Sequence, residues 1–512
     1  MTSTLFTGGA IHTFGAPEPS GWLLVDDGVV VGSGARGDEP AAERRIDLAG
    51  ASLVPGFCDA HVHLPATGLA ASGMDLRDVH EASTITAAFA RRAGTGGVLF
   101  GGNFEDPLDR PLTRSDLDAA VGDRPALLAR ADMHSCIVST ALLASLGIDG
   151  SEGVDRDATG RPTGYLREQA AGAAWRWFDA HLPAVDQRRA IEAAVGIAYS
   201  RGVTCVHEMY VVEWRGWGSL DRIREVAEEV ALGVALYVAT SEVGRVKEMG
   251  LERVGGDLFL DGSFGSYTAW LSRPYTSTPP SGAPEAGMRY RTDDELADVF
   301  RAAQVAGMQC GVHAIGDAAI DQALRGWEAV AEEVGLEAVR ALGHRIEHFE
   351  CATDDHIRRA VRLGLRISIQ PGFDRLWGGQ HGMYARRIGW ERAASMNRFG
   401  TMTRAGLTVG AGSDSTVTPL DPLFQMAALR SHHVPEERLA PREALYLHTA
   451  GAHALDGSVP GAGSLAPGTP ADLAVLDRDP LAVSDEELVD TAVLGTWVAG
   501  TRVWPPAEAE AR

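Results

Sequence analysis

Short apolar runs alternate with amphipathic segments through the middle of the chain, and this alternation is typical of strand–helix units that build a parallel sheet. Eight such runs can be counted: Leu53–Ala60, Val203–His207, Val234–Ala239, Asp257–Asp261, Met308–His313, Arg345–Phe349, Arg366–Gln370 and Thr408–Ser413. Eight parallel strands close a (β/α)8 barrel, and the active site of such a barrel lies at the carboxyl ends of its strands. We therefore predict an α/β fold with a TIM-like (β/α)8 barrel over residues 56–454.

Both ends of the chain show a different pattern, in which short apolar stretches are separated by glycine and proline. Near the N-terminus the predicted strands are Leu5–Phe14, Gly21–Asp26, Val29–Gly34 and Arg45–Leu48. Near the C-terminus they are Ala471–Asp477, Thr491–Val498 and Thr501–Trp504. These stretches predict one small β-sandwich built from residues 1–55 and 455–512, with the barrel inserted between its two halves.

The segment between the first and second barrel runs is far longer than one strand–helix connection. We therefore expect an insertion at about residues 65–201, with strands near Val98–Gly101 and Ala126–Ala131 and helices near Ser139–Leu146 and Asp186–Arg201. Long insertions at the active-site face of a barrel usually form lids or substrate walls.

The composition is that of a soluble globular protein, since 45% of the 512 residues are hydrophobic and 22% are charged. No apolar stretch reaches membrane-spanning length and the N-terminus lacks the pattern of a secretion signal, so the predicted location is the cytoplasm. A net charge of −23 leaves no basic footprint for phosphate groups, which argues against nucleic acid and anionic membranes as partners. The expected partner is a small molecule, and the formation of a homodimer is left open.

The five cysteines are scattered, and no two of them have the CxxC spacing: Cys58, Cys136, Cys205, Cys310 and Cys351. This pattern indicates neither a disulfide framework nor a thiolate zinc site. We expect most of them to be small core residues in a reducing compartment.

The stretch GFCDAHVHL, residues 56–64, contains the first candidate metal ligands. His61 and His63 stand at alternate positions after an apolar run, so on a strand both project to one side near its carboxyl end. Neutral imidazole is a good ligand for zinc, iron and similar ions. Taken alone, the pair says little, because a chain with 16 histidines contains such pairs by chance.

Three more candidate ligands stand at the ends of later predicted strands. His313 ends MQCGVH, His348 ends RIEH, and Asp414 follows TVGAGS. Closure of the barrel would bring all three to the same mouth as His61 and His63. Four histidines and an aspartate at one mouth indicate a metal centre.

Several ordered motifs resemble those of a known family: HVH, TGYLREQA, DGSFGSYTAWL, HAIGDAAID, RIEHFE, SIQPGF and GAGSDSTVTPLDP. Over nearly the whole chain they resemble the amidohydrolase superfamily, in the amidohydrolase-3 branch that contains the N-substituted formamide deformylases and the YtcJ-type proteins. The resemblance implies a metal-dependent hydrolase with two divalent ions. It places His61 and His63 on the first ion, His313 and His348 on the second, and makes Asp414 a weak ligand and proton shuttle.

The chemistry of divalent ions agrees with this resemblance. Such an ion lowers the pKa of bound water and polarises a carbonyl group, so no serine or cysteine nucleophile is required. Asp414 can take the proton of the water and pass it to the leaving group. His134, in ADMHSC, matches a family position near the substrate and is a candidate for polarising or contacting it. Glu347, next to His348 on a strand, is expected on the opposite face, in packing or a salt bridge.

One position departs from the family pattern. Members of the family usually carry a lysine in K-x-x-x-D-G, which is carbamylated and bridges the two ions, whereas this chain reads GDLFLDG with Asp257 at the lysine position. We predict that Asp257 bridges the ions directly, because its carboxylate keeps the same charge and oxygen donors. A single-metal site is one alternative, since aspartate is several atoms shorter than carbamylated lysine, and Asp261 or Glu208 in the bridging role is another. Zinc is the default metal, and iron and manganese also fit imidazole and oxygen ligands.

The loops expected over the mouth are rich in large apolar side chains: Trp214, Trp217, Phe264, Tyr267, Trp270, Phe373, Trp377, Met383, Tyr384 and Trp390. They predict a roomy hydrophobic pocket that accepts a bulky acyl group or N-substituent. The predicted reaction is hydrolysis of the carbonyl C–N bond of an amide or formamide. The same site would also cleave an ester or thioester, and hydrolytic deamination on one ion and a non-catalytic ligand-binding barrel are further alternatives.

Overall fold

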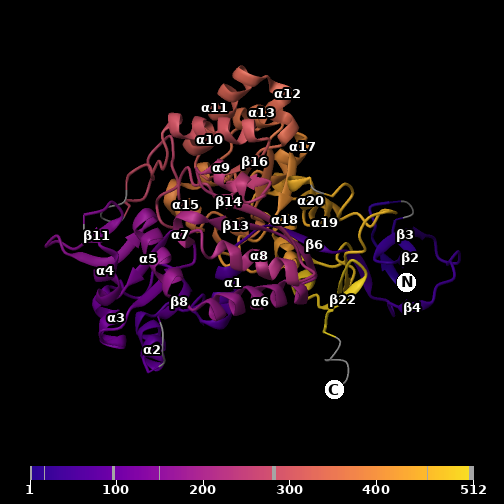
Figure 1. Ribbon diagram of the computed structural model, residues 1–512, viewed down its shortest axis with the longest axis horizontal. Coiled ribbons are helices and arrows are strands. Elements are labelled where there is room, and N and C mark those ends of the chain that lie inside the picture. The colour runs from indigo at the N-terminus through magenta and orange to yellow at the C-terminus, as the bar shows by residue number, and fades with distance from the viewer. Residues whose placement is uncertain are drawn as a thin grey trace.

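The computed structural model describes residues 3–15, 18–94, 98–148, 150–279, 284–457 and 459–506. At its centre eight parallel strands form one sheet in the order β19-β18-β17-β16-β15-β14-β13-β6. Figure 1 labels β6, β13, β14 and β16 of this sheet in the middle of the molecule. A parallel bridge between Val62 and Ser415 links the two edges, so the sheet closes almost completely into the predicted barrel. The strands are β6 (Phe57–Val62), β13 (Val203–Val211), β14 (Gly233–Ala239), β15 (Arg253–Val254), β16 (Gln309–Ala314), β17 (Arg345–His348), β18 (Arg366–Ile369) and β19 (Thr408–Ala411).

Helices connect these strands and cover the outside of the barrel. Two of them begin with a capping box, in which Thr292 and Thr353 each accept a backbone hydrogen bond from the residue three positions later. The same two helices end at a left-handed glycine, Gly307 and Gly364, which is the residue best suited to that conformation. The connecting helices are α7 (Val212–Arg215), α8 (Leu220–Glu229), α9 (Val243–Glu248), α10 (Asp293–Ala306), α11 (Asp317–Val334), α12 (Leu336–Leu342), α13 (Asp354–Leu363), α14 (Pro371–Trp377), α15 (Met383–Ile388), α16 (Trp390–Ala393) and α17 (Phe399–Arg404).

The predicted first run, Leu53–Ala60, is wrong as a single barrel strand. The chain divides it at Gly56 into β5 (Ser52–Pro55), which belongs to the terminal sheet, and β6, which belongs to the barrel. An added Cβ at Gly56 would overlap the side chain of Thr204, so glycine allows the two sheets to meet here.

The predicted fourth run, Asp257–Asp261, is also displaced. The regular strand is β15 at Arg253–Val254, and within the predicted run only Phe259 forms a bridge, to His313. Gly255 and Gly256 separate the two parts with φ of 82° and 77°, a conformation that ends a regular strand and favours glycine.

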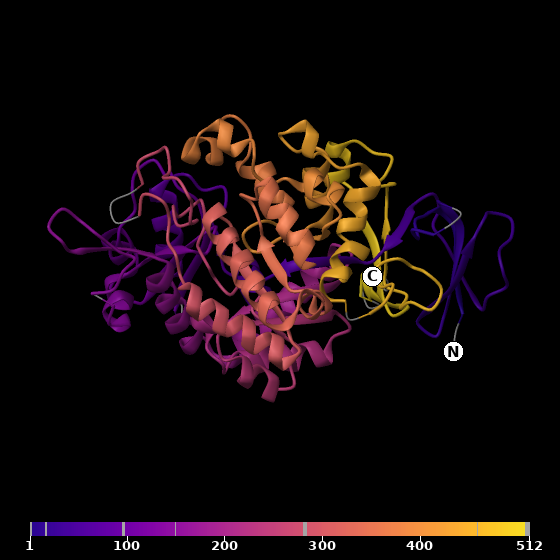
Figure 2. The ribbon, with the colours of Figure 1, turned by 90° about the horizontal axis from the view of Figure 1, so that it is seen from above.

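Strands from both ends of the chain pair in one eight-stranded sheet. Its order is β22-β21-β20-β5-β1-β2-β3, with β4 beside β1. Figure 2 shows the N-terminal strands at one end of the molecule and the insertion at the other, with the barrel between them. The members are β1 (Thr4–Ile11), β2 (Ser20–Asp26), β3 (Val29–Gly34), β4 (Arg44–Asp47), β5, β20 (Leu473–Leu476), β21 (Val493–Val498) and β22 (Thr501–Trp504).

This terminal sheet encloses its own apolar core. Phe6 of β1 meets Trp497 of β21 edge to face at 5.6 Å, so residues from both chain ends form one contact. Four further elements connect the barrel to the C-terminal strands: α18 (Pro422–Arg430), the 3-10 helix η1 (Pro435–Glu437), α19 (Pro441–Leu447) and α20 (Ala450–Asp456). Helix α21 (Asp485–Val489) lies between β20 and β21.

The insertion between β6 and β13 folds around a six-stranded sheet of order β11-β12-β10-β9-β8-β7, with a separate apolar core. Helices α1 and α6, which begin and end the insertion, pack against each other. Its elements are α1 (Leu64–Ser72), β7 (Met74–Asp75), α2 (Ala82–Arg92), β8 (Leu99–Phe104), α3 (Arg114–Val121), β9 (Ala126–Arg130), β10 (Ser135–Val138), α4 (Thr140–Leu146), β11 (Val154–Arg156), β12 (Pro162–Arg167), α5 (Glu168–His181) and α6 (Ala184–Ser200). Across the part of the chain that the structure describes, no helix is both long and apolar enough to cross a bilayer.

Candidate metal centre

Six side chains predicted as metal ligands come together at the carboxyl ends of the barrel strands. Four are imidazoles at or directly after a strand end, and two are carboxylates from the segments that follow β15 and β19: His61, His63, His313, His348, Asp257 and Asp414. All six are nine-tenths buried or nearly so. The barrel therefore converts six positions spread over more than three hundred residues into one polar cluster.

Asp257 lies in the middle of the four histidines. One carboxylate oxygen, Oδ2, is 3.3 Å from Nε2 of His61 and 3.1 Å from Nε2 of His63. The other, Oδ1, is 3.6 Å from Nδ1 of His313 and 3.6 Å from Nε2 of His348. Each oxygen thus faces a different pair of histidines, which is the arrangement that a carboxylate between two cations requires.

Asp414 closes one side of the cluster. Its Oδ1 is 3.5 Å from Nε2 of His61 and 3.2 Å from Nε2 of His63. The backbone at Asp414 has φ of 52°, and that at His348 has φ of 71°. A non-glycine residue in this left-handed region costs about 1–3 kcal/mol and is found most often at functional sites, where the surrounding structure holds it in place.

Hydrogen bonds on the far side of each ring fix which nitrogen faces the cluster. Nδ1 of His63 donates to the carbonyl of Met209 at 2.9 Å, and Nδ1 of His348 bonds Oε1 of Gln370 at 2.7 Å. His313 is turned the other way, with Nε2 3.3 Å from the carbonyl of Gly262 and Nδ1 towards Asp257. Partners of this kind orient metal-binding histidines in proteins generally.

Glu347 performs the same function for His61, which sequence reasoning did not anticipate. Its Oε2 is 3.0 Å from Nδ1 of His61, while Arg345 donates to the same carboxylate at 2.8 Å from both Nε and Nη2. Burial opposes ionisation of Glu347, but the charge of Arg345 prevails and lowers the pKa of this carboxyl to about 2. The predicted salt bridge is therefore present, and it also holds a candidate ligand.

The atoms that face the centre fit a divalent cation. Nε2 of His61, Nδ1 of His313, Nε2 of His348, and Oδ1 of Asp257 and Asp414 are all buried without a hydrogen-bond partner among the described residues. Buried polar atoms without partners are costly, and such atoms converging on one point call for an ion. Two ligands on a tetrahedral zinc ion lie about 3.4 Å apart, given Zn–N and Zn–O distances near 2.1 Å, and the observed separations are close to this value.

The two alternative bridging carboxylates are engaged elsewhere. Asp261 accepts backbone hydrogen bonds from Trp270, Ile315 and Gly316 at 2.8–3.0 Å. Glu208 accepts one from the backbone of Leu64 at 2.6 Å. Both carboxylates therefore hold the loops around the centre.

The short side chain of Asp257 reaches the histidines because the backbone approaches them. Gly255 and Gly256 directly precede it, and an added Cβ at these positions would overlap the carbonyl of Gly311 and the side chain of Met209. Only glycine allows the chain to lie this close to its neighbours. The close approach of the backbone at Gly255 and Gly256 thus compensates for the shorter side chain of aspartate relative to a carbamylated lysine.

His134, the predicted substrate contact, comes from the insertion and lies beside the centre. Its ring is 5.3 Å from that of His313, and its Nδ1 is 2.9 Å from Oε2 of Glu168, a fully buried residue with φ of 51°. Tyr290 also donates a hydrogen bond to Glu168. Burial opposes protonation of the ring, but the charge of Glu168 and its hydrogen bond raise the pKa of His134 to about 9. Glu168 occurs in the TGYLREQA motif, yet no role was predicted for it.

A cavity opens directly onto this cluster, and the insertion forms one wall of it. Arg130, Asp132 and His134 line that wall. Half of the aromatic and methionine side chains predicted over the mouth also line this cavity, and the other half are not in its lining; those in the lining are Phe264, Phe373, Trp377, Met383 and Tyr384. Sequence reasoning missed the buried pair of Arg130 and Asp132, whose Nη1 and Oδ2 are 2.7 Å apart. The cavity lining therefore combines large apolar side chains with charged ones.

The chain is similar over most of its length to known amidohydrolases and to a solved metal-dependent hydrolase. Putative amidohydrolase YtcJ of Bacillus subtilis is 29% identical over 94% of this chain and 95% of its own, and N-substituted formamide deformylase of Arthrobacter pascens is 26% identical over 89% of each. A crystal structure of an uncharacterized metal-dependent hydrolase from Pyrococcus furiosus matches with a TM-score of 0.74 and 30% identity, over 94% of this chain and 100% of that one. The family model described as "Amidohydrolase family" matches residues 44–504. The chain therefore belongs to the amidohydrolase family of hydrolases.

Proposed function

We propose that the protein hydrolyses the carbonyl C–N bond of an amide or formamide that carries a bulky hydrophobic group, and that it does so with two divalent cations. The observation that carries this proposal is the position of Asp257, whose two oxygens face separate histidine pairs amid buried atoms that lack partners. The relatives named above support the reaction class. The large apolar side chains in the cavity lining support the hydrophobic substrate.

Four histidines and two aspartates would hold the cations: His61 and His63 one ion, His313 and His348 the other, Asp257 between them, and Asp414 beside the first. Bound there, divalent cations polarise a carbonyl group and lower the pKa of water. The second ring nitrogens, fixed by Glu347, Met209 and Gln370, keep the histidines in one orientation before substrate arrives.

Asp414 is the proposed proton carrier. Its carboxylate lines the cavity, and its Oδ1 is 3.2 Å from Nε2 of His63. It accepts the proton when the carbonyl carbon is attacked and delivers it to the amine nitrogen as the C–N bond breaks. His134 is the proposed carbonyl contact: because Glu168 engages Nδ1, Nε2 is the nitrogen available to donate to the carbonyl oxygen.

The test combines elemental analysis with a matched substrate panel. Purified protein should contain about two divalent ions per chain and should hydrolyse an N-arylalkyl formamide or amide far faster than unsubstituted formamide. His61→Ala should lose both metal and turnover while its far-UV circular dichroism stays unchanged, because the barrel core does not require the ions. Turnover of the matching ester or thioester but of no amide would overturn the proposed bond, and full metal with unchanged turnover in His61→Ala would overturn the centre.

A further inference from the structure

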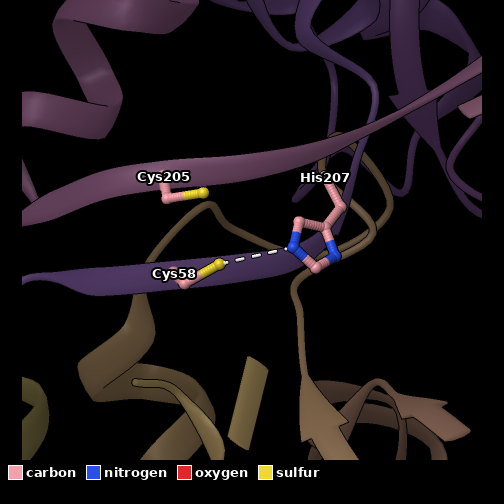
Figure 3. Close-up of side chains that lie close together, drawn as sticks. All are labelled: Cys58, Cys205 and His207. Carbon is pink, nitrogen blue, oxygen red and sulfur yellow. Dashed lines mark hydrogen bonds between the residues drawn. The ribbon is translucent and has the colours of Figure 1, made fainter. Parts of the chain in front are cut away.

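A second cluster of reactive side chains lies near the start of the barrel strands β6 and β13. Cys58 of β6 and Cys205 of β13 are direct partners in the parallel ladder, and His207 stands two residues farther along β13 (Figure 3). The two sulfur atoms and a ring nitrogen of His207 all lie within 4.8 Å of one another. Residues 149 positions apart in the sequence thus form one compact group.

Arg345 fixes the direction of the hydrogen bonds in this group. A guanidinium only donates, and its Nη1 lies 2.8 Å from Nδ1 of His207, so Nδ1 must accept. The neutral ring then carries its proton on Nε2, which points at the sulfur of Cys58 at 3.7 Å. Burial, followed by the charge of Arg345, lowers the pKa of His207 well below its usual value, which agrees with a neutral ring.

The same argument weighs against a metal ion between these three residues. A metal-binding histidine offers one bare nitrogen to the ion and donates from the other to an acceptor. In His207 the nitrogen away from the cysteines already accepts from a cation, and the nitrogen towards them carries the proton. The ring is therefore a donor to sulfur.

Cys205 is the member of the pair that outside reagents can reach. Cys58 is fully buried, whereas Cys205 is partly exposed and lines a surface cleft. Charged groups around it in that cleft are His453 and Asp456 of α20, Arg253 and Glu252 near β15, and Asp472 before β20. A hydrogen bond from Cys58 outweighs burial and, with the charge of His453, lowers the pKa of Cys205 to about 6, while burial raises that of Cys58.

We propose that Cys58 and Cys205 form an oxidisable dithiol in which Cys205 is the attacking thiolate, a peroxide is the oxidant and Cys58 is the resolving thiol. Hydrogen bonds run from Arg345 to His207 and from His207 to Cys58, and Cys205 is the ladder partner of Cys58 that lines the surface cleft. Paired strands lie about 4.8 Å apart, which falls within the 4.4–6.8 Å range of Cα separations that a disulfide spans.

The chemistry balances with one peroxide for each pair. The sulfur of Cys205 attacks one peroxide oxygen and breaks the O–O bond, so that Cys205 becomes a sulfenic acid and hydroxide leaves. The sulfur of Cys58 then attacks the sulfur of Cys205 and forms the S–S bond. The oxygen of the sulfenic acid leaves as hydroxide, which takes up the proton that Cys58 loses. In total, two thiols and hydrogen peroxide give one disulfide and two waters, and a thiol reductant reverses the change.

The test is peptide mass mapping of the full-length protein after treatment with hydrogen peroxide and alkylation of the remaining thiols. We expect the wild type to yield a linked pair of peptides containing Cys58 and Cys205, which dithiothreitol separates. In Cys58→Ser, Cys205 should remain as a sulfenic acid that a dimedone probe traps. Before oxidation, Cys205 should alkylate at neutral pH at least about tenfold faster than buried Cys310.

Cys310→Ser is the matched control, because Cys310 is a buried barrel cysteine in β16 outside the cluster, and it should leave the linked pair unchanged. Two results would overturn the proposal. One is a wild type in which Cys205 becomes oxidised without any link to Cys58. The other is a loss of about one zinc ion per chain in both Cys58→Ser and Cys205→Ser but not in Cys310→Ser, which would make the cluster a metal site.

Discussion

Asp257 is the proposed bridge between two metal ions, since its carboxylate oxygens lie 3.1–3.6 Å from nitrogens of four histidines. Asp257→Asn keeps the shape of the side chain but removes the charge that screens two cations from each other. We expect its metal content to fall from about two ions per chain to one or fewer, with loss of most activity. Elemental analysis alongside kinetics would measure both. Two ions in the variant would show that the carboxylate does not bridge.

Lysine at the same position gives an independent readout of the bridge. The ammonium of Asp257→Lys would repel both cations, whereas its carbamate would restore an anion between them. Metal binding by this variant should therefore depend on added bicarbonate, while that of the wild type should not. Equal metal content of the variant with and without bicarbonate would contradict this expectation.

Asp414 should matter for rate more than for metal content. Asp414→Asn is nearly isosteric and leaves the other ligands in place, but an amide cannot carry the proton. We expect near-normal metal content and a turnover reduced by roughly 10²- to 10⁴-fold. Turnover within a few-fold of the wild type would remove Asp414 from the proposed proton transfer.

His344 should make stability depend on pH. Its ring stacks on Trp327 at 3.6 Å, and burial, followed by the charge of Arg366, lowers the pKa of His344 from 6.5 to about 3. Between pH 6.5 and 3 the unfolded chain binds a proton at His344 that the folded protein does not bind. The free energy of unfolding is therefore highest above pH 6.5 and decreases as the pH falls towards 3. Between pH 6.5 and 4.5, the free energy of unfolding of His344→Gln should fall by roughly 2 kcal/mol less than that of the wild type. Denaturant titrations at both pH values, with exposed His181→Gln as control, measure the difference.

At the scale of elements, the close contact of α1 and α6 couples the insertion to the metal centre, because α1 begins directly after His63. A Cβ added at Gly68 of α1 would overlap the backbone carbonyl of Ala190 on α6, which no side-chain rotation relieves. We expect Gly68→Ala to cost about 1–3 kcal/mol of stability and to weaken metal binding, since it displaces α1. Thermal unfolding and metal titration would measure this.

Gly196→Ala is the matched control for that helix pair. Gly196 is exposed on α6 and nothing lies within 4 Å of its added Cβ. There the substitution should stabilise the protein by about 0.4–1 kcal/mol, because it reduces the freedom of the unfolded chain. Equal effects of the two substitutions would show that the helix contact does not depend on Gly68.

The apolar pattern predicted which elements exist better than where they begin. Runs that are buried along their whole length, such as Met308–His313, form barrel strands, because such a run has the length of one strand and is covered on both faces. The two errors, at Gly56 and at Gly255–Gly256, both arise where glycine lets the backbone approach another segment closely. Such an approach depends on residues far away in the sequence, so no local pattern reveals it.

Strand ends indicated the four histidines and Asp414 as candidate ligands, and the family pattern indicated Asp257, but neither indicated the residues that orient them. Glu347 was expected to face away from His348, and it does so by facing His61 instead. Glu168 and Gln370 contact the site through single hydrogen bonds that no spacing indicates. Cys58 and Cys205 seemed unrelated for the same reason, since only the pairing of β6 with β13 joins them.

At the scale of the whole molecule, the terminal sheet requires both ends of the chain. Strand β5 is fully buried and pairs with β20, and Phe6 packs on Trp497. A chain that stops after residue 468 lacks β20 to β22 and would expose this core and an unpaired strand edge. We expect it to accumulate as insoluble protein, whereas a chain that stops after residue 506, which keeps every described strand, should remain soluble. Fractionation of expressed protein compares the two.

The pairing of β5 with β20 also means that the terminal sheet cannot form until nearly the whole chain has been synthesised. Roughly 400 residues separate these strands, and a ribosome that adds about 5–20 residues per second needs some 20–80 s to bridge them. For most of that interval the first strands are outside the ribosome while the C-terminal strands that pair with them have not been synthesised. The nascent barrel can fold in sequence as it emerges, but the N-terminal segment must wait, and it is the part of the newborn chain on which a holding chaperone would act.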